Sequence, residues 1–205
     1  MDRTSHWQRV YTTKAEDDVS WFEASPSLSL QMMEAAGLTT ETCVLDVGGG
    51  DSKLVDALVA RGLTCLGILD ISAAALARAR VRLGPAGGVP TWIAADVTTD
   101  WSFEPVDIWH DRAVFHFLTG PEDRERYREH LHDTLKPGGT TIIATFALDG
   151  PERCSGLPVA RYSPETLAAE LGQDFQLVSS SNHAHRTPSR ATQSFQYSRF
   201  TRVGR

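Results

Sequence analysis

At 205 residues the chain is long enough to bury a substantial core and too short for two ordinary domains, so we expect a single domain. Its 20 Lys and Arg against 26 Asp and Glu give a formal charge of −6. This charge argues against a nucleic-acid or anionic-membrane partner, because such partners recruit a basic face. The N-terminus has no apolar signal core, and no run approaches the ~18 apolar residues of a membrane span, which predicts a cytoplasmic protein with no membrane attachment.

Aromatic side chains are concentrated in residues 1–40, a segment that is otherwise polar. Trp7 and Tyr11 are four positions apart and share one face of a predicted helix. Trp21 and Phe22 follow them. One interpretation is a helical arm that packs on the rest of the domain through these rings.

A glycine turn follows the first apolar run. Val44–Val47 is typical of a buried parallel strand, and it leads through Gly48–Gly50 into a predicted helix at Lys53–Ala60. Glycines in such a turn let a ligand approach the main chain, and the helix that follows offers unpaired N–H groups. The pattern therefore predicts a cofactor site. A dinucleotide-binding fingerprint would need a third glycine where the chain has Lys53.

Strand-like and helical runs then alternate along the chain. The next apolar runs each lead to an acid: Leu63–Leu69 to Asp70, Thr91–Ala95 to Asp96, and Val106–His110 to Asp111 and Arg112. Predicted helices lie between them, Ala73–Leu83 with Ser72 as its N-cap and Pro121–Leu135. A fifth run opens with Leu135-Lys136-Pro137-Gly138-Gly139, which is typical of a helix end and a Pro-Gly-Gly turn, and continues as a strand at Thr140–Phe146. Such alternation predicts a parallel sheet with helices on both faces.

The C-terminal part predicts an antiparallel hairpin. Two strand-like runs, Asp174–Ser181 and Gln193–Arg202, are joined by a polar loop. A helix at Pro164–Leu171 precedes them, with Ser163 as its N-cap and Pro164 at its first position.

Cysteine and histidine spacing predicts neither disulfides nor a metal site. Cys43 and Cys65 fall in apolar strands and are expected to be core thiols, and the three cysteines show no paired spacing. His183 and His185 would project from one side of a strand, but the sequence identifies no third ligand. We expect them in a polar loop near the last hairpin, with no bound metal.

Three features follow one another in the sequence: Asp46-x-Gly48-x-Gly50, the acids at 70, 96 and 111, and Pro137-Gly138-Gly139. In this order they resemble the motifs of class I S-adenosylmethionine (SAM)-dependent methyltransferases over residues 43–147. The resemblance implies a single Rossmann-like, doubly wound, seven-stranded and mostly parallel sheet with an antiparallel C-terminal hairpin, plus an N-terminal helical arm. We expect an arm or lid at 1–40, a cofactor-binding core at 41–147, and a substrate loop with the closing hairpin at 148–205.

The resemblance implies SAM as the cofactor. The residues expected to bind it are Asp46, Gly48, Gly49, Gly50, Asp70, Ile71, Asp96, Val97, Asp111 and Arg112. In this assignment Asp70 holds the ribose and Asp96 borders the adenine. The alternative for both acids is helix N-capping after a strand, because Asp is also a good cap.

Asp111 and His116 are the candidate catalytic residues. They follow the fourth strand, where the reactive methyl group is expected, and histidine titrates near neutrality and could take a proton from the acceptor. Against this, Asp111 and Arg112 can form a buried ion pair, and His116 can be a packing residue. Alkylation of a thiolate, carboxylate or amine needs no base at all.

The expected acceptor is a small molecule that is methylated on O, S or N. By analogy with families that carry an aromatic N-terminal arm, the arm is expected to close a pocket lined by Tyr11, Trp21, Phe22, Phe115 and Tyr162. Cys154 follows the fifth strand and could contact the substrate.

Three alternatives remain at this point. Gly48-Gly49-Gly50-Asp51-Ser52 also resembles the turn of a group of protein-lysine methyltransferases. A nicotinamide-dependent reductase is disfavoured by Lys53 and by the lack of a Tyr-x-x-x-Lys pair. A non-catalytic SAM-binding module would be indicated by eroded cofactor motifs, which are intact here.

Overall fold

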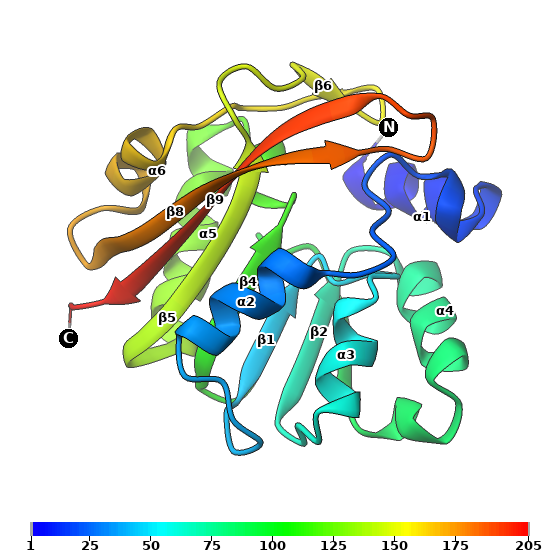
Figure 1. Ribbon diagram of the computed structural model, residues 1–205, viewed down its shortest axis with the longest axis horizontal. Helices are drawn as coiled ribbons and strands as arrows, with labels where there is room; N and C mark the ends of the chain where they lie inside the picture. Colours follow the sequence, from blue (N-terminus) through cyan, green and yellow to red (C-terminus); the bar gives the residue numbers. More distant parts are fainter. Residues whose placement is uncertain (1, 205) are drawn as a thin grey trace.

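The computed structural model describes residues 2–204. It consists of a seven-stranded sheet with helices on both faces (Figure 1). In spatial order the strands are β3 (Thr91–Ala94), β2 (Leu66–Asp70), β1 (Val44–Val47), β4 (Val106–Arg112), β5 (Leu135–Phe146), β9 (Thr192–Arg202) and β8 (Phe175–Arg186). The first five are parallel, and β9 runs antiparallel to both of its neighbours. The predicted Rossmann-like, doubly wound sheet with an antiparallel hairpin is confirmed.

Helices and two short strands complete the chain. The helices are α1 (Arg3–Thr13), α2 (Ser27–Ala35), α3 (Leu54–Ala60), α4 (Ala73–Leu83), α5 (Pro121–Thr134) and α6 (Pro164–Leu171), with short 3-10 turns at Glu16–Asp18, Gly84–Gly88 and Phe115–Phe117. Strands β6 (Arg153–Cys154) and β7 (Leu157–Pro158) pair with each other. None of the helices within residues 2–204 is long and apolar enough to cross a membrane.

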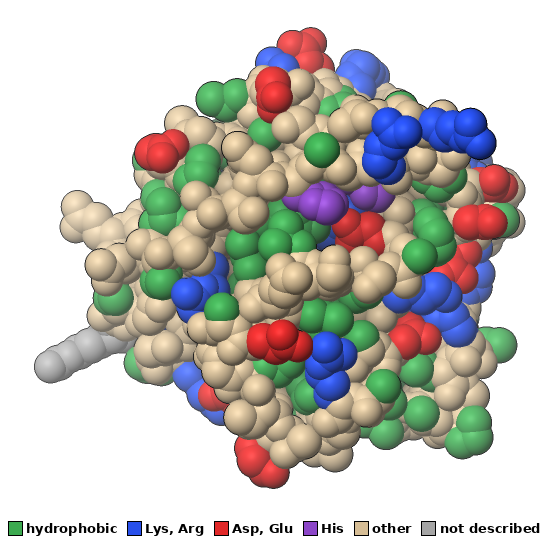
Figure 2. All heavy atoms as spheres, viewed as in Figure 1, with side chains coloured by type: hydrophobic (Ala, Val, Ile, Leu, Met, Phe, Trp, Pro, Cys, Tyr) green, Lys and Arg blue, Asp and Glu red, His purple; other side chains and the backbone are tan. Residues whose placement is uncertain are grey.

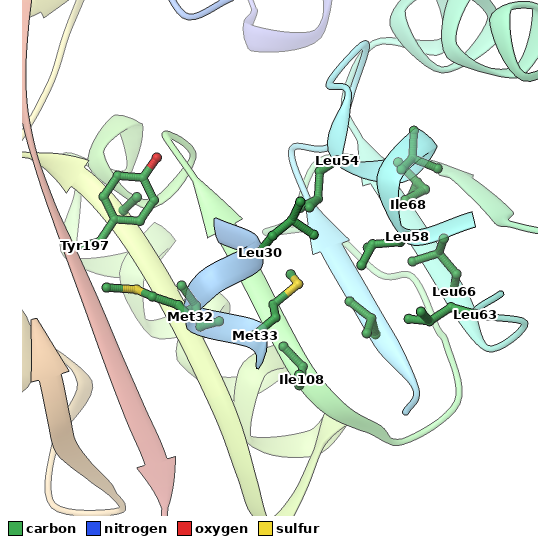
Figure 3. Close-up of a cluster of buried hydrophobic side chains, with 14 of the residues drawn as sticks. Leu30, Met32, Met33, Leu54, Leu58, Leu63, Leu66, Ile68, Ile108 and Tyr197 are labelled. Carbon is green, nitrogen blue, oxygen red and sulfur yellow. The ribbon is translucent and has the colours of Figure 1, made fainter. Parts of the chain in front are cut away.

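The central strands are buried on both faces because helices cover both. Val44 and Ile68 face a cluster with Leu30 and Met33 of α2 and Leu58 of α3 (Figure 3). Alternate positions of the same strands, such as Leu45 and Val47, face a second cluster built with α5 and α6. This two-sided burial explains why the strand sequences are continuous apolar runs.

Local capping signals place two helices where the sequence predicts them. The Ser72 hydroxyl accepts from the Ala75 N–H (3.3 Å) at the start of α4. At α6, Ser163 and Thr166 cap each other's backbone N–H groups. These contacts lie within a few residues in sequence, so local sequence is sufficient to predict them.

Two predicted boundaries are wrong. A helix end at Leu135 and a turn at Pro137–Gly139 are expected where the fifth run opens, but all these residues belong to β5, which begins at Leu135 and passes through Gly138 at φ +77°. The second difference is in the hairpin, where β8 continues to Arg186 because β9 pairs with it up to Thr192. His183 and His185 therefore lie in a strand and not in a loop.

The prediction of core thiols at Cys43 and Cys65 is also wrong, because the two residues form a disulfide with their Cα atoms 4.6 Å apart. They precede Val44 and Leu66, which are direct partners in the β1–β2 ladder. Parallel pairing therefore brings them side by side although 22 positions separate them in sequence. Cys154 is a buried free thiol.

We predict that thiol titration of the denatured, unreduced chain detects Cys154 alone. Replacing Cys43 by Ser should lower the free energy of unfolding by about 3 kcal/mol, because the disulfide restricts the unfolded chain between residues 43 and 65. Urea denaturation measures the difference. A reductant should destabilise the wild type and leave Cys43→Ser unchanged. Three titratable thiols in the unreduced wild type would contradict the pairing.

Candidate functional site

The turn between β1 and α3 is closely packed and requires glycine. Gly48 has φ +68°, and a Cβ there would collide with Val114 Cγ2. A Cβ on Gly50, at φ +42°, would lie 2.7 Å from Asp70 Oδ2. Both positions combine a left-handed backbone with a close neighbour, so any side chain would displace the turn.

Asp46 lies beneath this turn, and only one of its two carboxylate oxygens is hydrogen-bonded. Nδ1 of His110 donates to its Oδ1 (2.7 Å), and Nε2 of the same ring lies 2.9 Å from Ser29 Oγ. All three side chains are buried. The other carboxylate oxygen, Oδ2, has no hydrogen-bond partner, and it lies 2.7 Å from where a Cβ of Gly49 would be. A buried oxygen without a partner costs free energy and indicates that an additional donor belongs here.

The acids after β2 and β3 bind local backbone groups and also line a cavity. Asp70 Oδ1 accepts from the Ser72 N–H (2.7 Å), and burial raises the pKa of Asp70 to about 7. Asp96 accepts from the N–H and hydroxyl of Thr98 (3.0 and 2.8 Å). Its other oxygen lies 3.1 Å from Arg3 Nε. Each acid therefore supports its own loop and keeps a second oxygen for another partner.

A cavity opens at the carboxyl ends of these strands. Of the residues predicted to bind the cofactor, it is lined by Gly48, Asp70, Ile71, Asp96, Val97 and Arg112. The arm contributes Arg3, Trp7, Tyr11 and Trp21. The cavity measures about 100 Å³, below the ~300 Å³ of small ligand pockets. The arm therefore occupies part of the space that a ligand would need.

Arg112 joins the cavity to the arm and the hairpin. Its Nε donates to Tyr197 Oη (2.9 Å) and its Nη1 to the Trp21 carbonyl (2.9 Å). Nη2 lies 3.0 Å from Glu23 Oε1. The ion pair between Asp111 and Arg112, the alternative to a functional role, is not formed, because Arg112 instead pairs with Glu23.

Asp111 and His116 lie outside the cavity. Asp111 is fully buried and accepts from the N–H groups of Val114 and Phe115 (2.8 and 3.0 Å) and from Tyr127 Oη (2.8 Å). Burial raises the pKa of Asp111 to about 6. The ring of His116 is also buried and accepts from the Phe146 N–H (3.2 Å), and burial lowers its pKa to about 3. Both side chains hold the backbone that forms the cavity wall.

The predicted acceptor residues are divided among three places. Tyr11 and Trp21 line the cavity, and Trp21 Nε1 donates to Tyr11 Oη (3.2 Å). Phe22 lines neighbouring clefts. Phe115 and Tyr162 instead pack against each other in the cluster on the α5 face of the sheet, with ring centroids 5.5 Å apart. The five residues predicted to line the acceptor pocket therefore do not lie together in one pocket.

Other apolar residues complete the cavity wall and were not predicted to do so. They include Val114, Phe117, Phe146 and Phe195. Phe195 lies in the predicted last strand, but nothing in the strand pattern indicates that it faces the cavity. Cys154 also lines the wall, and burial raises the pKa of its thiol to about 11, so the sulfur is protonated at neutral pH.

Comparison with known proteins gives one family match and many similar folds. Residues 45–141 match the family model of a methyltransferase domain. No curated protein matches the sequence.

Similar solved structures include one from a study of the conversion of a disulfide bond into a thioacetal group during echinomycin biosynthesis. It is 22% identical with a TM-score of 0.76, over 98% of this chain and 93% of that one. A second is 1,6-didemethyltoxoflavin-N1-methyltransferase from Burkholderia thailandensis, with bound 1,6-didemethyltoxoflavin and S-adenosylhomocysteine (19%, TM-score 0.69, 98% and 84%). A third is the N-methyltransferase NodS from Bradyrhizobium japonicum WM9, in complex with S-adenosylhomocysteine (15%, TM-score 0.73, 99% and 100%). At these identities the likeness shows the fold.

We predict that Asp70→Asn stabilises the free chain at alkaline pH. The pKa of Asp70 is about 7 in the folded chain and its ordinary value is 3.8, so the folded chain binds this proton more tightly than the unfolded chain. Its contribution to stability is complete below about pH 4 and is lost as the pH rises through 7. At pH 8 the variant should gain up to about 4 kcal/mol over the wild type.

Urea denaturation of both proteins between pH 4 and pH 8 measures this gain. The difference between the two isolates Asp70 from the other titrating groups. A difference that does not change with pH would contradict the proposed ionisation of the buried carboxyl.

Proposed function

Because this chain belongs, by its fold and by the methyltransferase domain at residues 45–141, to the class I SAM-dependent methyltransferases, we propose that it binds SAM and methylates a small molecule. The observation that carries the proposal is the buried, incompletely paired carboxylates around the glycine turn. Bound SAM would supply a methyl group on a positively charged sulfur, ready for in-line displacement. The protein must then bind, align and exclude water.

The residues around the turn fit such a cofactor. Gly49 lies beside the carboxylate oxygen of Asp46 that lacks a partner, and Gly48 and Gly50 hold the turn at left-handed backbone angles. Asp70 would accept the ribose hydroxyls, because one of its oxygens is not used by Ser72. Ile71 and Val97 would pack on the adenine, and Arg112 would hold the carboxylate of the methionine part. Asp96 would reach the adenine edge only after Arg3 moves away from it.

We expect no protein base to act on the acceptor. Asp111 and His116 are fully buried outside the cavity, and the thiol of Cys154 is protonated. In this proposal Asp111 and His116 position Val114, Phe115 and Phe146 in or behind the wall. The acceptor atom is then one that is nucleophilic by itself, which favours an amine or ring nitrogen over an alcohol.

The acceptor class follows from the shape of the site. Trp7, Tyr11 and Trp21 cover the cavity, and Phe117 and Phe195 complete an apolar wall. Such a covered aromatic pocket suits a compact ring system, whereas a protein-lysine or nucleic-acid substrate would need an open groove. Two proteins with this fold are N-methyltransferases, and one of them holds 1,6-didemethyltoxoflavin. We therefore propose a small, flat, nitrogen-containing acceptor.

We predict that calorimetry detects SAM and S-adenosylhomocysteine binding of order micromolar, with a Kd weakened about 10- to 100-fold in Asp70→Asn, because a charged hydrogen-bond acceptor is lost. The matched control is Asp133→Asn, an exposed residue of α5. Circular dichroism checks that both variants are folded. Wild-type protein that binds neither ligand would overturn the cofactor assignment, and tighter binding of NADH or NADPH would favour a reductase.

We predict that deleting residues 1–22 abolishes turnover and weakens SAM binding, because the deletion removes Trp7, Tyr11 and Trp21 from the cavity wall. Trp7→Ala, which keeps the chain length, should lower kcat/KM in the same direction. The measurement is transfer of labelled methyl groups from SAM to metabolite and protein fractions in parallel. If the truncated chain methylates protein as well as the full chain does, the acceptor is not a small molecule. Binding without transfer to any fraction would indicate a non-catalytic module.

A further inference from the structure

Three side chains with metal-binding atoms meet outside the cofactor cavity. Glu23 comes from the arm, and His183 and His185 come from β8. Nε2 of His183 and Nδ1 of His185 each lie 3.7 Å from Glu23 Oε1. One ligand atom from each residue lies within 4.8 Å of the others. The sequence places the two histidines together but cannot place Glu23 beside them, because 160 positions separate Glu23 from His183.

The hydrogen bond of His185 to the backbone uses Nε2 and leaves Nδ1, the nitrogen that faces Glu23, free to bind a metal ion. Its Nε2 lies 2.8 Å from the Ser20 carbonyl oxygen, which can only accept, so Nε2 carries the hydrogen. In the neutral ring the lone pair is then on Nδ1, and Nδ1 faces Glu23. Metal-binding histidines are usually fixed in this way, with the second ring nitrogen donating to a carbonyl or carboxylate.

The three groups do not satisfy one another. A separation of 3.7 Å is too long for a hydrogen bond, and within residues 2–204 neither of the two facing nitrogens makes another one. A lone pair on His185 that faces a carboxylate oxygen is also electrostatically unfavourable unless something positive lies between them. Arg112 Nη2 is 3.0 Å from the same Glu23 oxygen and fixes the position of the carboxylate, so a bound ion would share this oxygen with the guanidinium.

An ion can reach the three groups from solvent. Glu23, His183 and His185 line a cleft of about 460 Å³ between the arm and the hairpin, together with Phe22, Leu28 and Pro188. Figure 2 shows histidine and acidic side chains side by side at a hollow in this face of the molecule. The groups are therefore accessible without unfolding, as a metal site requires.

We propose that Glu23, His183 and His185 bind a divalent transition-metal ion, for which Zn²⁺ is the best-matched probe. Two imidazoles and one carboxylate are a known zinc donor set that leaves a fourth position for water. Two atoms that bind one Zn²⁺ at ~2.0–2.1 Å cannot be more than ~4.2 Å apart, and both 3.7 Å distances meet this limit. The two facing nitrogens lie within 4.8 Å of each other, so the histidine rings would also move toward one another when the ion binds.

Occupation of this site would join the arm to the closing hairpin. Glu23 follows Trp21 and Phe22, and β8 pairs with β9, which carries Phe195 of the cavity wall. The ion would therefore bind the folded chain and not the unfolded one, and it should raise the melting temperature as its concentration rises. The proposal rests on these contacts and is independent of methyl transfer.

The test is Zn²⁺ binding to the full chain, measured by equilibrium dialysis with elemental analysis and by calorimetry. It is run without reductant so that Cys43 and Cys65 remain paired. We expect one Zn²⁺ per chain and a higher melting temperature. His183→Ala and Glu23→Gln should each weaken binding by more than about 100-fold, beyond the loss expected for a supporting residue.

Control variants remove one histidine or one carboxylate elsewhere. His130→Ala on α5 alters a ring that stacks on Trp101, and Glu122→Gln alters an exposed carboxylate on α5. Both should bind Zn²⁺ as the wild type does. The proposal is overturned if the wild type binds no Zn²⁺ above the level of the His183→Ala variant, or if the controls lose binding to the same extent.

Discussion

The mostly buried guanidinium of Arg112 connects parts of the chain that local sequence cannot bring together. From the end of β4 it holds the Trp21 carbonyl and Glu23 in the arm, and Tyr197 on β9. A buried charge must be paired, and removing one partner typically costs about 3–5 kcal/mol. The need to satisfy this one cation therefore positions both the arm and the antiparallel strand beside the cofactor cavity. The arrangement of the site walls depends on it.

The buried carboxylates differ in how completely the protein pairs them. Asp111 accepts from three donors and supports the fold. Asp46 has one satisfied and one unsatisfied oxygen, and Asp70 uses one oxygen for its own loop. The incompletely paired acids are those at the glycine turn. A protein that keeps an acid with so few partners gives up stability at that position, which is the usual sign of a ligand site.

Local signals explain which features the sequence could predict. The caps of α4 and α6 depend on neighbours within three residues, and the glycine turn depends on backbone angles that only glycine adopts easily. The order of acids after successive strands places Asp70 and Asp96 at one edge of the sheet, because parallel strands end together.

Features that depend on how distant segments pack against one another could not be predicted from the sequence. Ala113 has φ +72°, so the chain turns sharply after β4 and sends Phe115 to the α5 face of the sheet, away from the cavity. The Cys43–Cys65 pair needs the β1–β2 alignment, and the approach of Glu23 to His183 needs the arm to fold back onto the hairpin.

The small size of the cofactor cavity also has a consequence for the rate of ligand binding. A space of about 100 Å³ cannot admit a nucleoside-sized ligand, so association must wait for the arm to open. The apparent affinity is then the intrinsic affinity reduced by the fraction of open chains, and the binding rate reaches a ceiling set by the opening step.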